Sequence, residues 1–485
     1  MAHVVNELPV SDLAFHVERH GIDFIPLEER WATPRAIAGL WAGASVNVEY
    51  LVYGAILMTF GFSFPEAVAI IVLGNLSWVL VGLASLQGPQ SGTTVFAINR
   101  APFGPRGSKA IALCNWLTML GFEAEGLILI VGAGLVLAAK AGVAPSSPLK
   151  AGLIVGAVAV QVVLPFLGHA TMTRVLRWLI VPFIVIYVVL AGFAAGHAHV
   201  STTAHGVSWQ LWTVGLAFTI ALSGLGWTEN GNDYSRYLPP DASRRSIVSW
   251  LFLATAIPEI ALMTLGAAVF SFVGTGTSWS LANPFAAFQD QHVLPGWFVV
   301  VFMGFVVAQL FGINSLDLYS SGVTLQALGL RVRRYHAVLI DSAICCAITF
   351  YAVFNSQFST LLKDFVAVVI IWIAPWCGVF LTDWVLRGMR CDPIAIQEVG
   401  PSSIYWATSG INWAAIGAQA AGGVAALLAL NASFMPTWLN VVTMRTGGHL
   451  GGADFSIFLG LGVGAGVYAW LGRSRVRHQA GLLTG

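Results

Sequence analysis

Charged side chains are scarce in this sequence: only 9% of its 485 residues are Asp, Glu, Lys or Arg. A soluble domain usually carries about 25% charged residues, so a water-exposed surface of this size could not be built from so few. The net charge of +1 gives no electrostatic basis for binding a nucleic acid. The five cysteines have neither the spacing of a disulfide framework nor that of a metal cluster, and we expect no bound metal or other cofactor.

Hydrophobic residues are abundant instead, at 57% of the chain, and the sequence also holds 52 glycines and 18 tryptophans. Apolar runs of roughly 20 residues, the length that crosses a lipid bilayer as a helix, recur along the whole chain. We therefore predict an all-α polytopic membrane protein. Its twelve predicted transmembrane helices lie near residues 34–58, 66–86, 109–139, 150–168, 175–195, 210–230, 246–273, 297–322, 335–354, 361–387, 410–430 and 453–472. The segment 281–292 is too short to span and is predicted to be an outer half-helix in the interface.

The distribution of basic residues predicts the orientation. With the N-terminus inside, 19 of the 23 Lys and Arg residues fall in inner loops. The four that fall outside are Lys140, Lys150, Lys363 and Arg445. Basic residues collect in cytoplasmic loops, and one missed span would reverse this bias. We predict a single membrane domain, 34–472, in the plasma or inner membrane, between a cytoplasmic N-terminal segment, 1–33, and a cytoplasmic tail, 473–485. The N-terminal segment has no apolar signal core.

Two predicted spans look interrupted. The first contains WAGASVNVEYLVYGA, which places Asn47 and Glu49 mid-membrane, and the sixth contains ALSGLGWTENGNDYSRYLP, with Gly224 among its glycines. Unwound backbone at membrane depth is tolerated only where it lines a cavity or is buried in protein. Corresponding breaks in two halves are typical of transporters with five-helix inverted repeats, here about 34–195 and 210–387. The alternative is that these glycines only let helices pack closely.

Seven strings, in order along the chain, carry a family resemblance. They are APFGPRG at 101–107, NWLTMLGFEAEGLILIVGAG at 115–134, NDYSRYLP at 232–239, DLYSSGVTLQALG at 317–329, LTDWVLR at 381–387, GINWAAIGAQAAG at 410–422 and GADFSIFLG at 452–460. Together they resemble the nucleobase:cation symporter-1 family, the purine, cytosine and hydantoin permeases, with the cytosine–purine branch most similar. The resemblance implies a leucine-transporter-like fold, with two extra C-terminal helices at about 410–472. It also implies a non-enzymatic symporter that imports a nitrogen heterocycle with protons or sodium by alternating access.

A planar nucleobase is bound by stacking on its faces and by hydrogen bonds to its edges. By resemblance, Phe122 keeps the aromatic residue of the family's third span, whereas Gly126 stands where the family has an amide. Glu125 lies three residues from Phe122 on one helix face and is a candidate for the missing edge contact. Trp227 resembles the second stacking tryptophan of the cytosine–purine branch, and Gly224, at the glycine break, is included in the predicted substrate site. The alternative for Phe122 is packing against lipid or core, and the alternative for Trp227 is an anchor at the membrane interface.

Acidic side chains stand where the family contacts its substrate. Asp317 takes the position of a usual asparagine in the eighth span, and Asn314 lies one turn earlier on a similar face. Asn47 and Glu49 lie in the part of the first span that supplies substrate and cation contacts in the family. Ionisable residues at membrane depth are costly, so function is the first hypothesis for them. The alternative is that each acid pairs with a polar neighbour inside the bundle.

The predicted coupling ion is a proton. In sodium-coupled members, backbone carbonyls of the first span act with an alanine and a Ser/Thr pair of the eighth. Ala308 keeps the alanine, but the hydroxyl pair falls on Phe311 and Gly312. A hard cation needs oxygen ligands, and two side-chain oxygens are missing here. Buried carboxyl groups can hold a proton, so Glu49 and Asp317 are the predicted coupling residues, with sodium as the alternative.

Several substrate classes remain open at this point. Allantoin, hydantoins, nucleosides and vitamins such as thiamine are carried on similar scaffolds, and a cationic vitamin would suit the surplus of carboxylates. A channel should show a polar ring repeated in symmetric spans, and a receptor should carry a signalling domain, neither of which is recognised. No nucleophile–base pair of an enzyme lies within the spans. The exact substrate and the oligomeric state do not follow from the sequence.

The orientation can be tested with reporter fusions. Both termini should face the cytoplasm, because the 19-to-4 division of basic residues requires it. A fluorescent reporter that folds only in the cytoplasm should be active at the C-terminus, and a reporter active only outside should be silent there. The reverse pattern would overturn the predicted even number of spans.

Overall fold

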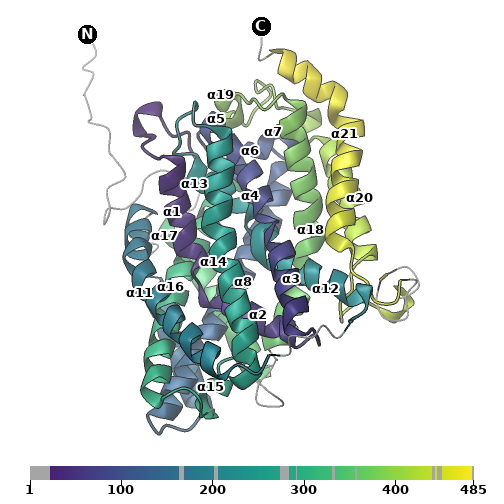
Figure 1. Ribbon diagram of the computed structural model, residues 1–485. Helices are drawn as coiled ribbons and strands as arrows, with labels where there is room; N and C mark the ends of the chain where they lie inside the picture. Colours follow the sequence, from purple (N-terminus) through teal and green to yellow (C-terminus); the bar gives the residue numbers. More distant parts are fainter. Residues whose placement is uncertain are drawn as a thin grey trace, which may run out of the picture.

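The structure is a computed structural model that describes residues 22–162, 169–200, 206–273, 283–290, 292–329, 334–355, 358–439, 443–444 and 450–482. The regular elements in these ranges are all helices, which confirms the all-α prediction, and most of them lie side by side (Figure 1). Residues 1–21 of the predicted N-terminal segment, 163–168 of the fourth predicted span, Arg445 and residues 483–485 of the predicted tail lie outside these ranges.

Eight helical segments in this part of the chain are long and apolar enough to cross a membrane. They are Phe64–Ser91, with α3 (Phe64–Asn75) and α4 (Trp78–Ala84); α8 (Ser108–Lys140); Trp178–His197 of α11 (His169–His197); Trp209–Ser235, with α12 (Trp209–Ile220) and α13 (Gly231–Ser235); α14 (Arg244–Val273); α16 (Gly296–Ala327); His336–Asn355 of α17 (Arg334–Asn355); and α18 (Phe358–Leu386). A ninth is the pair α1 (Pro34–Ser45) and α2 (Val48–Met58), which meet at a bend of 54°.

The remaining helices are shorter or follow the last of these segments. Two are apolar but short, α9 (Ser147–Gln161) and α20 (Trp413–Leu428), and α21 (Ser456–Leu482) has 27 residues. Small helices occupy the connections: α5 (Gly88–Ser91), α6 (Val95–Ile98), α7 (Arg100–Phe103), α15 (Ala287–Asp290) and α19 (Pro393–Gln397). Each of the twelve predicted spans overlaps one of the longer helices. The boundary predicted between membrane domain and tail, at residue 472, falls inside α21.

Two segments differ from the sequence-based expectation. The second span is not one helix over 66–86, because it is interrupted between Asn75 and Trp78, where the backbone of Gly224 packs against Ser77. The predicted half-helix at 281–292 is shorter than expected, since its described part contains only the four-residue α15. Asn283 explains this: its Oδ1 accepts from Phe285 N–H at 3.0 Å and its Nδ2 donates to a carbonyl of α8 at 3.2 Å, which forms a turn instead of a helical start.

The helices pack in three groups. The first group contains α1, α2, α3, α4, α12 and α14; the second contains α8, α9, α16 and α17; the third contains α18, α20 and α21. Two helices connect the first two groups: α11 packs against α1, α14 and α16, and α18 packs against α8 and the interrupted segment after α12. The breaks in the first and sixth predicted spans therefore lie where the first group faces the second.

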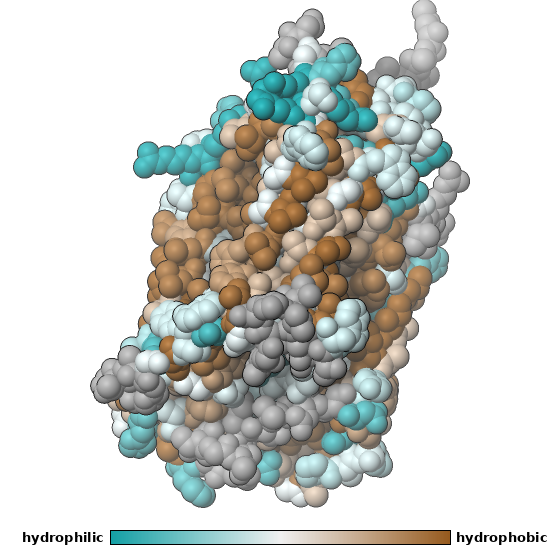
Figure 2. Space-filling view, turned by 90° about the vertical axis from the view of Figure 1, so that its right-hand side faces the viewer, coloured by the Kyte–Doolittle hydropathy of each residue, from teal (hydrophilic) through white to brown (hydrophobic). Residues whose placement is uncertain are grey.

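Charged residues gather at the ends of the molecule. In Figure 1, α1 begins and α21 ends at the top, whereas α15 and the C-terminal end of α8 lie at the bottom. Figure 2 shows a hydrophobic belt between a strongly hydrophilic top and a mixed lower end. Lys140 bonds to a carbonyl of α15 at 2.9 Å and so belongs to the lower end. This arrangement agrees with a bilayer across the hydrophobic belt.

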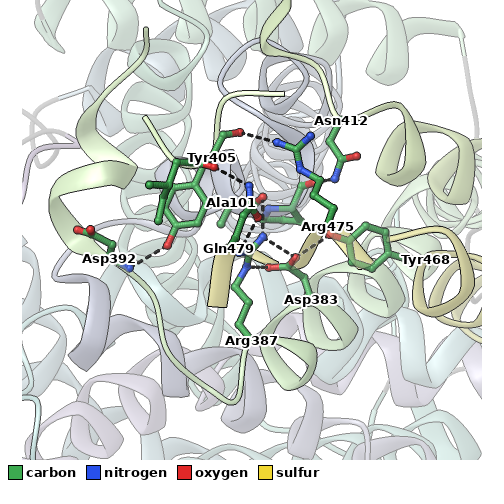
Figure 3. Close-up of polar contacts among 11 residues, drawn as sticks. Ala101, Asp383, Arg387, Asp392, Tyr405, Asn412, Tyr468, Arg475 and Gln479 are labelled. Carbon is green, nitrogen blue, oxygen red and sulfur yellow. Dashed lines mark hydrogen bonds and ion pairs between the residues drawn. The ribbon is translucent and has the colours of Figure 1, made fainter. Parts of the chain in front are cut away.

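A buried ion pair fixes the upper end of the third group (Figure 3). Arg387 Nε donates to Asp383 Oδ2 at 2.6 Å, and Tyr468 of α21 donates to Asp383 Oδ1 at 2.6 Å. Arg387 also donates to Gln479 at 2.9 Å and to the carbonyl of Ala101 at 3.0 Å. Both charges are therefore hydrogen-bonded, which buried charges require. The pair joins α18, α21 and α7.

Removing one member of this pair should destabilise the protein. Asp383→Ala leaves the buried guanidinium of Arg387 unpaired, and loss of one partner of a buried pair costs about 3–5 kcal/mol. Thermal unfolding in detergent, followed by size-exclusion chromatography, should show a clear loss of folded protein. Asp241→Ala, at an exposed loop position, is the control and should unfold like the wild type. Equal unfolding temperatures for both variants would contradict this role.

Candidate functional site

The break in the first span is built by Val46 and Asn47, whose φ and ψ angles (−80°, 73° and −134°, 142°) leave helical geometry. Asn47 caps α2, because its Oδ1 accepts from Glu49 N–H at 3.3 Å. Its Nδ2 also donates to Glu49 Oε2 at 2.9 Å. The structure thus brings these two predicted residues together, and the amide orients the carboxyl group.

Glu125 of α8 faces α2 from the second group of helices. Tyr53 of α2 donates to Glu125 Oε1 at 2.8 Å, while Oε2 is buried without a hydrogen-bond partner among the described residues. Glu125 also lines a pocket between α8, α17 and α18, together with Gly121 and Phe365. One carboxyl oxygen is therefore available for a further polar contact.

Gly126 lies against Asn314 of α16. A Cβ atom at Gly126 would lie 2.0 Å from Asn314 Oδ1, so the position must be glycine while the asparagine stays there. Asn314 Nδ2 donates to the carbonyl of Glu123 and to Gln161 Oε1, each at 3.1 Å. The family has an amide side chain at the position of Gly126. In this structure the amide side chain of Asn314, from the eighth span, lies beside that position. Glu123 points elsewhere, since its Oε1 accepts from Gln161 Nε2 of α9 at 2.9 Å.

The two predicted stacking residues both lie near Gly226. Phe122 is half-buried and meets Phe365 of α18 edge to face, with ring centroids 5.0 Å apart. A Cβ atom at Gly226, the neighbour of Trp227, would lie 3.8 Å from the Phe122 ring. Trp227 packs edge to face on Trp41 at 5.8 Å, and its Nε1 donates to the hydroxyl of Tyr50 at 3.1 Å. Both rings therefore border the break in the sixth span.

Asp317 is buried in α16 and joins a group of acids. It interacts electrostatically with Glu49 and with Glu125, which also interact with each other. Glu229, after the break of the sixth span, interacts with Asp317 as well. With its amide nitrogen facing the carboxylate, Asn115 of α8 donates to both Glu229 oxygens at 2.6 and 3.0 Å. Carboxyl groups from both groups of helices are thus near enough to influence one another in one buried region.

Two further predicted residues, Gly224 and Ala308, have no contact with these acids among the interactions described. Gly224 lies against the second span, and Ala308 is exposed. Gly224 N–H donates to Ser77 Oγ at 3.1 Å, and a Cβ atom at Gly224 would lie 2.3 Å from the Ser77 backbone, so glycine permits the sixth span to touch the second. Ser223 beside it leaves helical geometry, with φ −102° and ψ −130°. The Ala308 side chain is exposed, whereas the next residue, Gln309, is buried against the break of the first span.

Aromatic rings and a lysine gather below Tyr53. The ammonium group of Lys363 lies 4.3 Å from the ring centroid of Phe60, just after α2. Phe60 packs edge to face on Phe218 of α12 at 5.3 Å, and Phe218 packs on Tyr53 at 6.5 Å. These rings connect the end of α2 with α12 and with the lower part of α18.

Sequence reasoning missed Tyr53 and Gln309. Tyr53 supplies the hydrogen bond to Glu125, and Gln309 bonds to the backbone on both sides of the first break. Gln309 could have been found from the sequence, because it is a polar residue inside an apolar run. Tyr53 gave no such signal, because tyrosine is common at the ends of membrane spans.

Comparison with known proteins gives one family. Residues 24–453 match the sequence profile of permeases for cytosine/purines, uracil, thiamine and allantoin. YxlA of Bacillus subtilis, which bears the provisional name purine-cytosine permease, is 26% identical over 487 residues, covering 96% of this chain and 98% of its own. The purine-cytosine permease fcyB of Emericella nidulans is 25% identical over 385 residues, covering 76% of this chain and 73% of its own.

Solved structures with the same fold include two kinds of transporter. Mhp1, a nucleobase-cation-symport-1 family transporter in a closed conformation with bromovinylhydantoin bound, has a TM-score of 0.72 at 17% identity, covering 95% of this chain and 99% of its own. A manganese transporter of Eremococcus coleocola has a TM-score of 0.54 at 14% identity, covering 96% of this chain and all of its own. At these identities the likeness concerns the fold.

The contact between Gly126 and Asn314 can be tested with a double-mutant cycle. Gly126→Ala should destabilise the protein by about 1–3 kcal/mol, the usual cost of overpacking, because the new methyl group would overlap the amide oxygen. In an Asn314→Ala background the same change should cost almost nothing, since the overlapping atom is gone. Gly156→Ala, on a surface of α9 with no atom within 4 Å, is the control. An equal cost of Gly126→Ala in both backgrounds would refute the contact.

Proposed function

The chain belongs to the family of permeases for cytosine and purines, uracil, thiamine and allantoin, and we propose that it is a secondary active transporter that imports a nucleobase or a related nitrogen heterocycle. Members of this family are permeases and not enzymes. A symporter of this kind works by alternating access, in which two groups of helices expose the site to each side in turn. The proposed substrate is of the cytosine or purine type, as in the names of YxlA and fcyB.

The observation that supports a nucleobase most directly is the combination of two aromatic rings with buried acids at the helix breaks. Phe122 and Trp227 border the break of the sixth span, and they are the proposed plates for a planar ring. Glu125 and Asp317 are the proposed partners of its polar edge, helped by Asn314. Stacking on aromatic residues suits a heterocycle, whose edge donors and acceptors need buried polar groups.

The proposed architecture is the leucine-transporter-like one, with inverted repeats at about 34–195 and 210–387. The nine candidate spans, the short helices α9 and α20, and α21 would make up the twelve spans. Breaks in the first and sixth spans support this assignment, because first helices of the two repeats then share the same irregularity. We also propose that both termini face the cytoplasm and that the protein lies in the plasma or inner membrane, which the distribution of basic residues supports.

Protons are the proposed coupling ions, and Glu49 and Asp317 are the proposed carriers of the proton. They come from α2 and α16, in different groups of helices, and interact electrostatically. A proton can neutralise this pair before the site closes and loses water, so loading of proton and substrate become linked. The acids are also compatible with an alternative substrate. Their negative charge would stabilise a bound cationic vitamin such as thiamine. Allantoin, a hydantoin, a nucleoside or sodium coupling are the other outcomes that the assay distinguishes.

Uptake into proteoliposomes tests the function and the coupling together. Labelled cytosine or a purine should accumulate when the outside is made acidic, and an imposed sodium gradient should have no effect. Unlabelled purines, uracil, allantoin, a hydantoin, a nucleoside and thiamine, added as competitors, rank the substrates. Accumulation of none of these compounds would contradict the proposed function, whereas accumulation driven by sodium alone would contradict only the proton coupling.

Asp317→Asn sharpens the assay, because the change restores the amide that the family usually has here. Substrate binding should survive, while the dependence of uptake on pH weakens. Glu49→Gln tests the second acid in the same way. Asp364→Asn, on the surface at the lower end of α18, is the control and should keep the pH response of the wild type. A full pH response in both Asp317→Asn and Glu49→Gln would remove these acids from the coupling.

A further inference from the structure

The break in the first span leaves backbone groups that no helix pairs. The last carbonyls of α1 and the first N–H groups of α2 lack intrahelical partners, as at every helix end. Carbonyls at the end of a half-helix carry partial negative charge. Inside a membrane they need a donor or a bound cation, and broken helices in transporters use such carbonyls to coordinate coupling ions. The group that bonds to the free carbonyls at the end of α1 therefore influences which coupling ion the carrier can bind.

Gln309 of α16 bonds to the backbone on both sides of the break. Its Nε2 donates to the carbonyl of Val46, and its Oε1 accepts from Val48 N–H at 2.9 Å. The hydroxyl of Tyr187, on α11, donates to the same Oε1. Only 4% of Gln309 is exposed, so water does not compete for these bonds. One neutral amide thus satisfies the carbonyl end and the N–H end of the break together.

We propose that the carboxamide of Gln309 takes the place of a coupling cation at this break and thereby determines the ion selectivity of the carrier. The proposal rests on the proposed transport function. A sodium ion bound to the Val46 carbonyl would have to displace the amide nitrogen from that oxygen. Displacement would leave Val48 N–H and the Tyr187 hydroxyl without their acceptor in a buried region, which is unfavourable.

The neighbouring residues of α16 supply no side-chain oxygen that could bind a sodium ion in place of the displaced amide. Phe311 and Gly312 have no side-chain oxygen, and the Ala308 side chain is exposed. A hard cation prefers several oxygen ligands, so this turn of α16 provides too few side-chain oxygens. Because the amide is permanent, the first and second groups of helices are joined here without loading an ion. The titratable acids of the site are then left to carry the coupling.

The substitution Gln309→Glu separates this role from simple structural support. It keeps the size of the side chain and one acceptor oxygen for Val48 N–H and the Tyr187 hydroxyl. It replaces the donor to Val46 by a second, charged oxygen, so that two oxygens face one another and a cation is needed between them. Sodium should therefore raise the unfolding temperature of purified Gln309→Glu, at a pH that keeps the new carboxyl group ionised, whereas sodium should leave the wild type unchanged.

The measurement is thermal unfolding without substrate, with sodium chloride exchanged for choline chloride at constant ionic strength. Gln419→Glu is the matched control: Gln419 Nε2 donates to the carbonyl of Trp372 at 2.8 Å, so the same chemistry is changed away from the break. A sodium response of Gln309→Glu no larger than that of Gln419→Glu would overturn the proposal. Sodium-specific stabilisation of the wild type would also overturn the proposal. This second measurement tests the proposal even if the variant does not fold. Since no transport is measured, failure here is distinct from failure of the proposed function.

Discussion

Backbone polar groups at membrane depth must find partners inside the protein, and the two broken spans are arranged around that requirement. In the first span, Asn47 and Gln309 bond to the groups that the break exposes. In the sixth, Gly224 N–H bonds to the hydroxyl of Ser77. Each break is thus held by a side chain from another segment, which fixes where the second and eighth spans can lie.

The same bonds define where the two groups of helices meet. Among the described residues, polar contacts that cross between the groups include those from Tyr53 to Glu125, from Gln309 to the first break, and from Asn115 to Glu229. Two of these involve a carboxyl group, so protonation changes the strength of the contact between the groups. This gives a physical link between a proton and the relative position of the helices. The apolar faces that pack around these contacts supply no comparable switch.

The helices could be predicted from the sequence, because apolar runs of membrane length are a strong signal. The break in the first span was also predictable from Asn47 and Glu49, since polar groups are rare in such runs. The hydrogen-bond partner of each acid could not be predicted from the sequence. The pairing of Glu125 with Tyr53, for example, depends on how α2 and α8 pack. The contact of Gly126 with Asn314 was missed for the same reason: a glycine in one helix reveals nothing about which side chain fills its space.

In the proposed transport cycle, substrate and proton move the first group of helices relative to the second. Spin labels at exposed positions on the upper end can measure this: Arg245 on α14 and Lys109 on α8 lie in different groups, whereas Arg35 on α1 and Arg245 lie in the same group. Distances would be measured by pulsed electron resonance in a cysteine-free background, with and without a nucleobase at acidic and neutral pH. The account predicts a shift between Arg245 and Lys109 and none between Arg35 and Arg245. An unchanged distance between Arg245 and Lys109 under all conditions would contradict it.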